Sequence, residues 1–99
     1  MEKEISSKET KYVVYAISSK IRNYIYVGLT SDFESRLERH NKGYEKTTKP
    51  YRPFVLIYSE IQDDRVSARI REKYWKGASG KRKLRILRDS LESDCILSK

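Results

Sequence analysis

Runs of β-branched and aromatic residues alternate with polar segments along the first two thirds of the chain. Residues 12–17 and 24–27 are two such runs, and the segment between them is polar and turn-like. This pattern is typical of two strands joined in a hairpin. A third run at residues 54–61 predicts a further strand. Residues 1–11 are polar and show no apolar periodicity, so we expect a weakly ordered tail there.

The first helix is predicted between the second and third strands. Ser31 followed three residues later by Glu34 matches a capping box, which opens a helix over about residues 32–41. Gly43 is suited to end this helix, because glycine adopts the left-handed conformation common just past a helix. Residues 42–53 then carry both prolines and several basic side chains. This composition predicts an exposed loop that attracts phosphate.

Two further helices are expected after the third strand. Asp63 or Asp64 can cap a helix over about residues 66–76, and the Gly-Ala-Ser-Gly segment 77–80 is expected to break the chain. A last helix over about residues 81–91 places leucines at spacings of three and four on one apolar stripe. The order of elements predicts an α+β fold, with a small three-stranded, mostly antiparallel sheet flanked by about three helices.

Length and composition indicate one small domain. A chain of 99 residues has room for a single core, and 37% apolar with 36% charged residues suits a soluble protein. The apolar runs are far shorter than the roughly 20 residues that span a membrane, and no secretion signal is visible, so we expect a cytoplasmic protein with no membrane contact. The expected boundaries are a polar tail at 1–11, the domain at 12–92 and a C-terminal tail at 93–99.

The net charge of +8 indicates which kind of partner the protein binds. It arises from 22 basic and 14 acidic residues, and such an excess neutralises phosphates and steers a polyanion toward the protein. Nucleic acid is therefore the leading partner. A basic protein kept soluble by its charge, or held at an anionic surface, is the alternative interpretation.

The scarcity of cysteine and histidine limits the chemistry. Cys95 and His40 are each the only residue of their type, which excludes an intramolecular disulfide and a thiolate zinc cluster. A bound metal would rest mainly on oxygen ligands. Such ligands favour hard cations such as magnesium, calcium or manganese.

Helical spacing singles out three polar side chains. Glu72 shares a helix face with Ala68 and Trp75, although helix carboxylates usually form solvated ion pairs. Arg36 and His40 lie four residues apart beside the apolar stripe of the first helix, where they could converge on one phosphate. The alternative is a surface arginine and a histidine at the edge of the core.

Strand alternation brings two tyrosines together. Tyr15 and Tyr26 fall on the same face of adjacent strands in the predicted hairpin, so their side chains are expected to be near neighbours. A cross-strand tyrosine pair most often contributes packing alone. Taken by itself, the pair does not establish a site.

Together these residues resemble the GIY-YIG nuclease superfamily, whose two name motifs lie on the first two strands. The motifs read here Val13-Val14-Tyr15 and Tyr26-Val27-Gly28, and Arg36 and Glu72 stand on the first and second helices as in that family. The small members related to the incision domain of the excision-repair nuclease are closest, through segments 52–60 and 71–76. The resemblance spans about residues 12–87.

This resemblance implies a metal-dependent endonuclease that nicks DNA or cuts single strands, acting in DNA repair. Tyr15 would be the general base or water-positioning phenol with Tyr26 as its partner, Arg36 would clamp the phosphate and His40 would assist proton transfer. Glu72 would hold one divalent cation, Mg²⁺ or Mn²⁺. No small-molecule cofactor is expected, and we expect a monomer rather than a dimer. Basic residues expected along the DNA backbone are Lys46, Lys49, Arg52, Lys76, Lys81, Arg82 and Lys83.

The sequence also departs from the family pattern. Val13-Val14 replaces glycine-isoleucine, and Val27 replaces isoleucine. The asparagine that larger members carry downstream of Glu72 has no counterpart, because the only asparagines are Asn23 and Asn41. Two alternatives therefore stay open. One is a nucleic-acid-binding module of the same fold without cleavage, and the other is a structural basic protein of a ribonucleoprotein particle.

Overall fold

Three strands form the antiparallel sheet at the centre of the computed structural model, which describes residues 11–97. Of the tail predicted at residues 1–11, residues 1–10 lie outside the described residues. The strands are β1 (Tyr12–Ser19), β2 (Ile25–Thr30) and β3 (Phe54–Gln62), in the order β2-β1-β3. β1 is antiparallel to both neighbours, and Tyr15 stands opposite Gly28 in the pair with β2.

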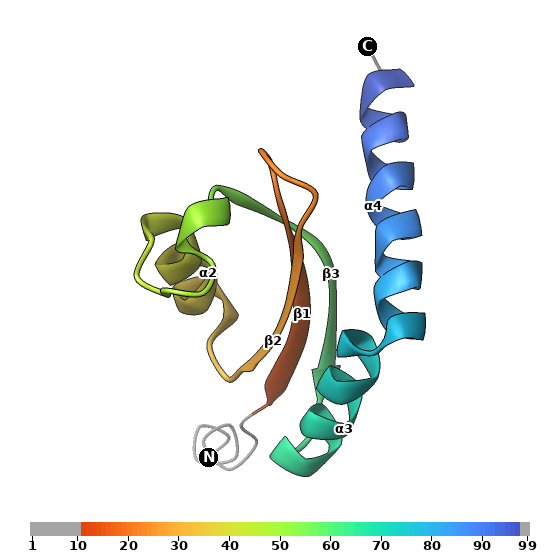
Figure 1. Ribbon diagram of the computed structural model, residues 1–99. Helices are drawn as coiled ribbons and strands as arrows, with labels where there is room; N and C mark the ends of the chain where they lie inside the picture. The colour runs from red at the N-terminus through yellow and green to blue at the C-terminus, as the bar shows by residue number, and fades with distance from the viewer. Residues whose placement is uncertain (1–10, 98–99) are drawn as a thin grey trace, which may run out of the picture.

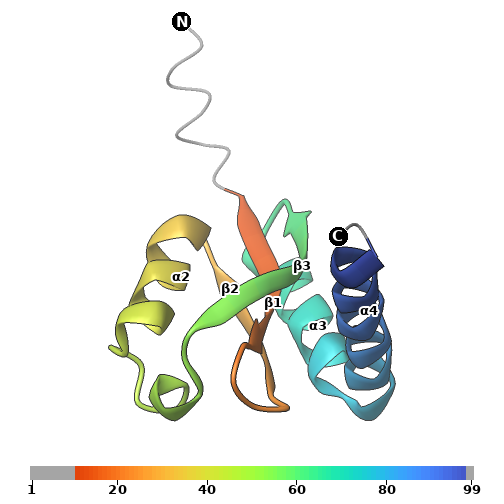
Figure 2. The ribbon, with the colours of Figure 1, turned by 90° about the horizontal axis from the view of Figure 1, so that it is seen from above.

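Helices cover both faces of this sheet. α2 (Phe33–Lys42) lies on one face, whereas α3 (Arg65–Lys76) and α4 (Ala78–Leu97) lie on the other (Figures 1 and 2). A short 3-10 helix, η1 (Lys49–Tyr51), sits between α2 and β3. The predicted α+β fold with a small antiparallel sheet and flanking helices is confirmed.

The helix boundaries differ slightly from those predicted. Asp32, not Ser31, is the N-cap of α2, because its side chain accepts a hydrogen bond from the Ser35 N–H at 3.3 Å. Asp64 caps α3 in the same way. Gly43 ends α2 as predicted, with a left-handed φ of 84°.

The predicted break between the last two helices is much shorter than expected. Only Gly77 separates α3 from α4, and Gly80 lies inside α4, where a Cβ would fall 2.6 Å from the Trp75 Cα. Glycine thus allows the two helices to meet closely. α4 also continues to Leu97, past the predicted end at residue 91 and into the segment assigned to a tail, since no glycine or proline follows Gly80 in it.

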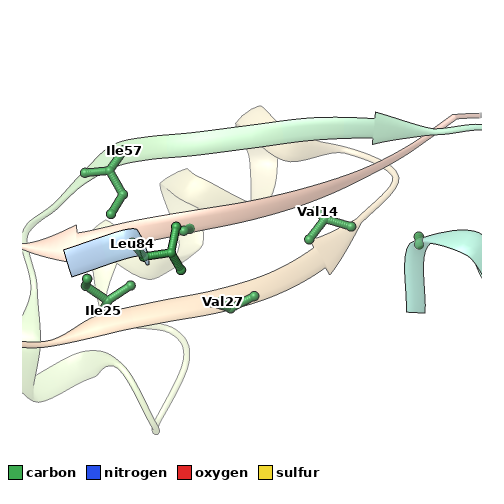
Figure 3. Close-up of a cluster of buried hydrophobic side chains, with 7 residues drawn as sticks. Val14, Ile25, Val27, Ile57 and Leu84 are labelled. Atoms are coloured by element: carbon green, nitrogen blue, oxygen red, sulfur yellow. The ribbon is translucent and has the colours of Figure 1, made fainter. Parts of the chain in front are cut away.

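Two apolar cores lie on the two faces of the sheet, as strand alternation requires. On the α3 and α4 face, Leu84 packs against the strands (Figure 3), and Ala68 belongs to the same cluster. On the α2 face, Phe33 and Leu37 pack against residues of β1. The first core contains the buried residues Val14, Ala16, Ile25, Val27, Ile57, Ala68 and Leu84, and the second contains Tyr15, Ile17 and Phe54.

Candidate active site

Four of the predicted site residues meet between the sheet and α2. Tyr15 comes from β1, Tyr26 from β2, and Arg36 and His40 from one side of α2. The Tyr15 hydroxyl lies 3.0 Å from His40 Nε2, and the Tyr26 and His40 ring centres are 4.9 Å apart. The two tyrosine rings are 6.3 Å apart. We call this group the tyrosine cluster.

Gly28 provides the space in which Tyr15 reaches the cluster. The two residues are cross-strand partners, and a Cβ built on Gly28 would clash with the Tyr15 hydroxyl and ring. The glycine of the second motif is therefore required by the close approach of a phenol.

A buried threonine orients His40. His40 Nδ1 lies 2.8 Å from Thr48 Oγ1, and the Thr48 hydroxyl donates to the Glu45 carbonyl at 3.4 Å. With its own proton directed there, Thr48 Oγ1 accepts from Nδ1–H, which leaves Nε2 to accept from the Tyr15 hydroxyl. Thr48 is fully buried, so the segment 42–53 is not the wholly exposed loop that we predicted.

Burial keeps Tyr15 and His40 in their uncharged forms. Burial raises the pKa of Tyr15 well above its usual range, and a charge on nearby Tyr26 would raise it further, whereas Arg36 opposes both effects. Burial lowers the pKa of His40, and Arg36 and Arg39 add to this against the opposing charge of Glu45. His40 is therefore an uncharged acceptor at neutral pH.

Tyr15 and Tyr26 differ in how much of each side chain is exposed to solvent. Tyr15 is 0% exposed, and its hydroxyl is engaged with His40, whereas Tyr26 is only partly buried. A general base must lie within hydrogen-bond reach of the water that it deprotonates. Tyr26 is the more accessible of the two phenols, and the catalytic role predicted for Tyr15 stays a prediction.

Glu72 lies outside the tyrosine cluster. It stands on α3, which packs on the opposite face of the sheet, and its side chain is 23% exposed. Its carboxylate pairs with Lys76 at 3.2 Å. Within residues 11–92, no group of three acidic, histidine or cysteine side chains could hold a metal ion. One carboxylate nevertheless suits Mg²⁺, which commonly keeps several waters and binds one or two carboxylates together with substrate phosphates.

A second carboxylate, Glu60 of β3, fixes the orientation of α3 and hence of Glu72. Glu60 Oε2 accepts from Arg71 Nε at 2.7 Å, and Oε1 accepts from Trp75 Nε1 at 3.1 Å and from the Tyr58 hydroxyl at 2.8 Å. These bonds, led by the one from Arg71, lower the pKa of Glu60 to about 2. Sequence analysis did not identify Glu60.

We expect Glu60→Gln to lower the free energy of unfolding by about 2 kcal/mol at pH 7, because charged hydrogen bonds from Arg71 are lost. Since folding depresses the pKa of Glu60 from 4.5, its stabilisation is complete above about pH 4.5 and disappears as the pH falls toward 2. Urea unfolding at several pH values should show the difference from wild type shrinking over this range. Glu92→Gln, at an exposed carboxylate, is the control. A stability difference that does not change with pH would contradict the stabilising role of the Glu60 charge.

The predicted DNA-contacting residues fall on the two sides of the molecule. Lys46 and Lys49 are exposed beside α2, whereas the Arg52 side chain lies against Gly43 and is half-buried. Near the α3–α4 junction, Lys76 pairs with Glu72 and Lys83 donates to the Tyr74 hydroxyl at 2.6 Å. Arg82 is exposed and Lys81 is partly buried.

Neither asparagine replaces the one that larger family members carry. Asn41 Oδ1 accepts from the Phe54 N–H at 2.7 Å, and Asn23 Oδ1 accepts from Arg88 at 2.8 Å. Both amides therefore have structural partners.

Comparison with known proteins agrees with this geometry. The profile of the GIY-YIG catalytic domain matches residues 11–85. The chain belongs to the GIY-YIG family. A UPF0213 protein of Staphylococcus haemolyticus is 36% identical over 80% of this chain and 96% of its own length, and one of Staphylococcus saprophyticus is 35% identical over 78% and 94%. No solved structure matches significantly.

GIY-YIG domains are nuclease domains, so membership indicates a nuclease-type enzyme family. The names of the UPF0213 relatives give no substrate or mechanism. Among residues 11–97, no helix is both long and apolar enough to cross a membrane.

Proposed function

We propose that this GIY-YIG protein is a metal-dependent endonuclease that hydrolyses DNA phosphodiester bonds by nicking or single-strand cleavage. The observation that carries the proposal is the convergence of two phenols, a neutral histidine and an arginine beside Gly28. A single active site cuts one strand at a time, so nicking is consistent with a monomer. The resemblance to an excision-repair incision domain favours DNA repair in the cytoplasm.

Each residue of the tyrosine cluster has its own role in hydrolysis. Tyr26, the partly exposed phenol, positions the water that attacks phosphorus, and Arg36 holds the scissile phosphate with its fork of donors. Tyr15 donates its hydroxyl hydrogen to His40 Nε2, and Thr48 keeps that nitrogen free to accept it. The proton released by the water ends on His40 Nε2, the unprotonated nitrogen of the cluster. The bond from phosphorus to the 3′ oxygen breaks, and the 3′ oxygen takes a proton from solvent.

Glu72 is the carboxylate that would hold the divalent cation, Mg²⁺ or Mn²⁺. When bound there, such an ion supplies Lewis-acid stabilisation of charge on the phosphate and the departing oxygen. Basic side chains on both sides of the sheet contact phosphates rather than bases, so we expect little sequence preference.

The test is cleavage of end-labelled single-stranded and duplex DNA in Mg²⁺, Mn²⁺ or EDTA. Wild type is expected to cut only with metal, and Glu72→Gln to cut at least about 100-fold more slowly, because the metal supplies several kcal/mol of transition-state stabilisation. Glu38→Gln is the matched control, since Glu38 forms the same i, i+4 pair with a lysine, Lys42, on an exposed helix face.

Two results would contradict this function. If wild type binds DNA but cuts it with neither metal, the nucleic-acid-binding module is left as the function. If Glu72→Gln cuts as fast as Glu38→Gln, Glu72 is not the metal ligand.

A further inference from the structure

A cleft opens between the start of β2 and α4, on the face of the sheet opposite the tyrosine cluster. Its volume is about 260 Å³. Residues 23–25 form one wall, and Lys81, Arg85 and Arg88 of α4 form the other. These three cations are spaced i, i+4 and i+7, which places them on one face of the helix. No acidic side chain lines the cleft.

Arg88 is held rigidly at one end of the cleft. Its Nη1 donates to Asn23 Oδ1 at 2.8 Å, its Nε lies 3.1 Å from Asp89 Oδ1, and its side chain is only 14% exposed. The hydrogen bond to Asn23 ties α4 to the turn of the hairpin. The cleft wall is therefore preorganised, which reduces the entropy lost when a ligand binds.

The other two cations lack a negative partner. Within the described residues, neither Lys81 nor Arg85 forms an ion pair. Lys81 is partly buried, and its pKa is lowered by burial and by the charges of Arg85 and Lys76. Lys81 is thus a partly buried cation beside the exposed Arg85, and such an uncompensated pair gains free energy from an anion placed between its members.

The end of α3 adds one more cation near the cleft. Lys76 pairs with Glu72 at 3.2 Å, and its charge helps to lower the pKa of Lys81. A row of three cations, Lys81, Arg85 and Arg88, then runs along one face of α4. Its length along one helix face suits consecutive phosphates of a strand better than a single small anion.

We infer that this cleft is a phosphodiester-binding subsite, in which Lys81 and Arg85 hold a backbone phosphate of the DNA strand away from the scissile bond and Arg88 shapes the wall. The inference rests on the proposed function for the identity of the ligand as DNA. It adds a second contact surface to the substrate path, on the α4 side of the sheet.

The test measures DNA binding without cleavage. Binding of a fluorescent single-stranded oligonucleotide is followed in EDTA at several NaCl concentrations, for wild type, Lys81→Gln, Arg85→Gln and Arg69→Gln. Each cleft variant is expected to raise Kd about 3- to 10-fold at 0.1 M salt and to reduce the slope of log K against log salt by about 0.7. Arg69→Gln, an exposed arginine of α3 outside the cleft, is expected to change neither.

A second readout locates the contact. The backbone amide signals of Asn23, Tyr24 and Ile25 should shift on oligonucleotide addition in wild type, and should shift much less in Arg85→Gln. An equal loss of affinity in Arg69→Gln would show diffuse charge and overturn the subsite. Shifts produced by inorganic phosphate but not by the oligonucleotide would assign the cleft to a free anion and also overturn it. Because EDTA prevents metal-dependent turnover, these results are independent of whether the protein cuts DNA.

Discussion

Tyr26→Phe is expected to reduce the rate of DNA cleavage by about 10²- to 10⁴-fold, the usual contribution of a positioned acid–base group. Tyr26 is the partly exposed phenol of the tyrosine cluster, and its ring lies 4.9 Å from that of His40. Because the substitution removes only the hydroxyl, the melting temperature and the Kd for DNA should stay near wild type. Single-turnover cleavage with Mg²⁺ and binding in EDTA measure the two effects separately.

Tyr15→Phe should behave differently, because the Tyr15 hydroxyl is enclosed and bonded to His40. Removing it leaves a buried imidazole nitrogen without a partner, which costs about 1–3 kcal/mol of folding free energy. The loss of activity should be smaller than for Tyr26→Phe. Tyr24→Phe, on the same face but stacked on Tyr51 at 3.9 Å, is the control. If Tyr15→Phe abolished cleavage at unchanged stability while Tyr26→Phe stayed active, Tyr15 would be the general base.

Local periodicity explains why most of the tyrosine cluster could be predicted from the sequence. Strand alternation placed Tyr15 and Tyr26 on one face, and helical spacing placed Arg36 and His40 on one side of α2. These relations depend only on neighbours along the chain. Because the hairpin and α2 were correctly predicted, the two tyrosines and the two α2 side chains could be expected to face each other.

The remaining parts depend on contacts between distant segments, which carry no periodic signal. Thr48 lies in a polar, proline-containing segment, yet the path of that segment folds it beneath His40. Glu60 looks like an ordinary strand carboxylate until α3 brings Arg71 and Trp75 to it. The full enclosure of Tyr15 likewise arises only when α2 covers the sheet. Spacing alone could not reveal these three features.

Gly28→Ala is expected to be as damaging to cleavage as the loss of a catalytic group. The new Cβ would clash with the Tyr15 hydroxyl and ring, so Tyr15 must shift, and its hydrogen bond to His40 is disturbed. Forcing an extra carbon into a packed core costs about 1–3 kcal/mol, and a displacement near 1 Å in a catalytic group can cost about 100-fold in rate. Urea unfolding and single-turnover cleavage measure the two losses.

Two further variants separate this steric effect from a general intolerance of alanine. Gly77→Ala should be nearly neutral, because the nearest atom to its Cβ is the Tyr74 carbonyl oxygen at an ordinary 3.4 Å. The double variant Gly28→Ala/Tyr15→Phe should lose less stability than the sum of the single variants, because phenylalanine lacks the clashing oxygen. Recovery stays incomplete, since the Tyr15 Cζ would also lie only 2.5 Å from the Cβ. Strictly additive losses would mean that Gly28 is needed for some reason other than room for the Tyr15 hydroxyl.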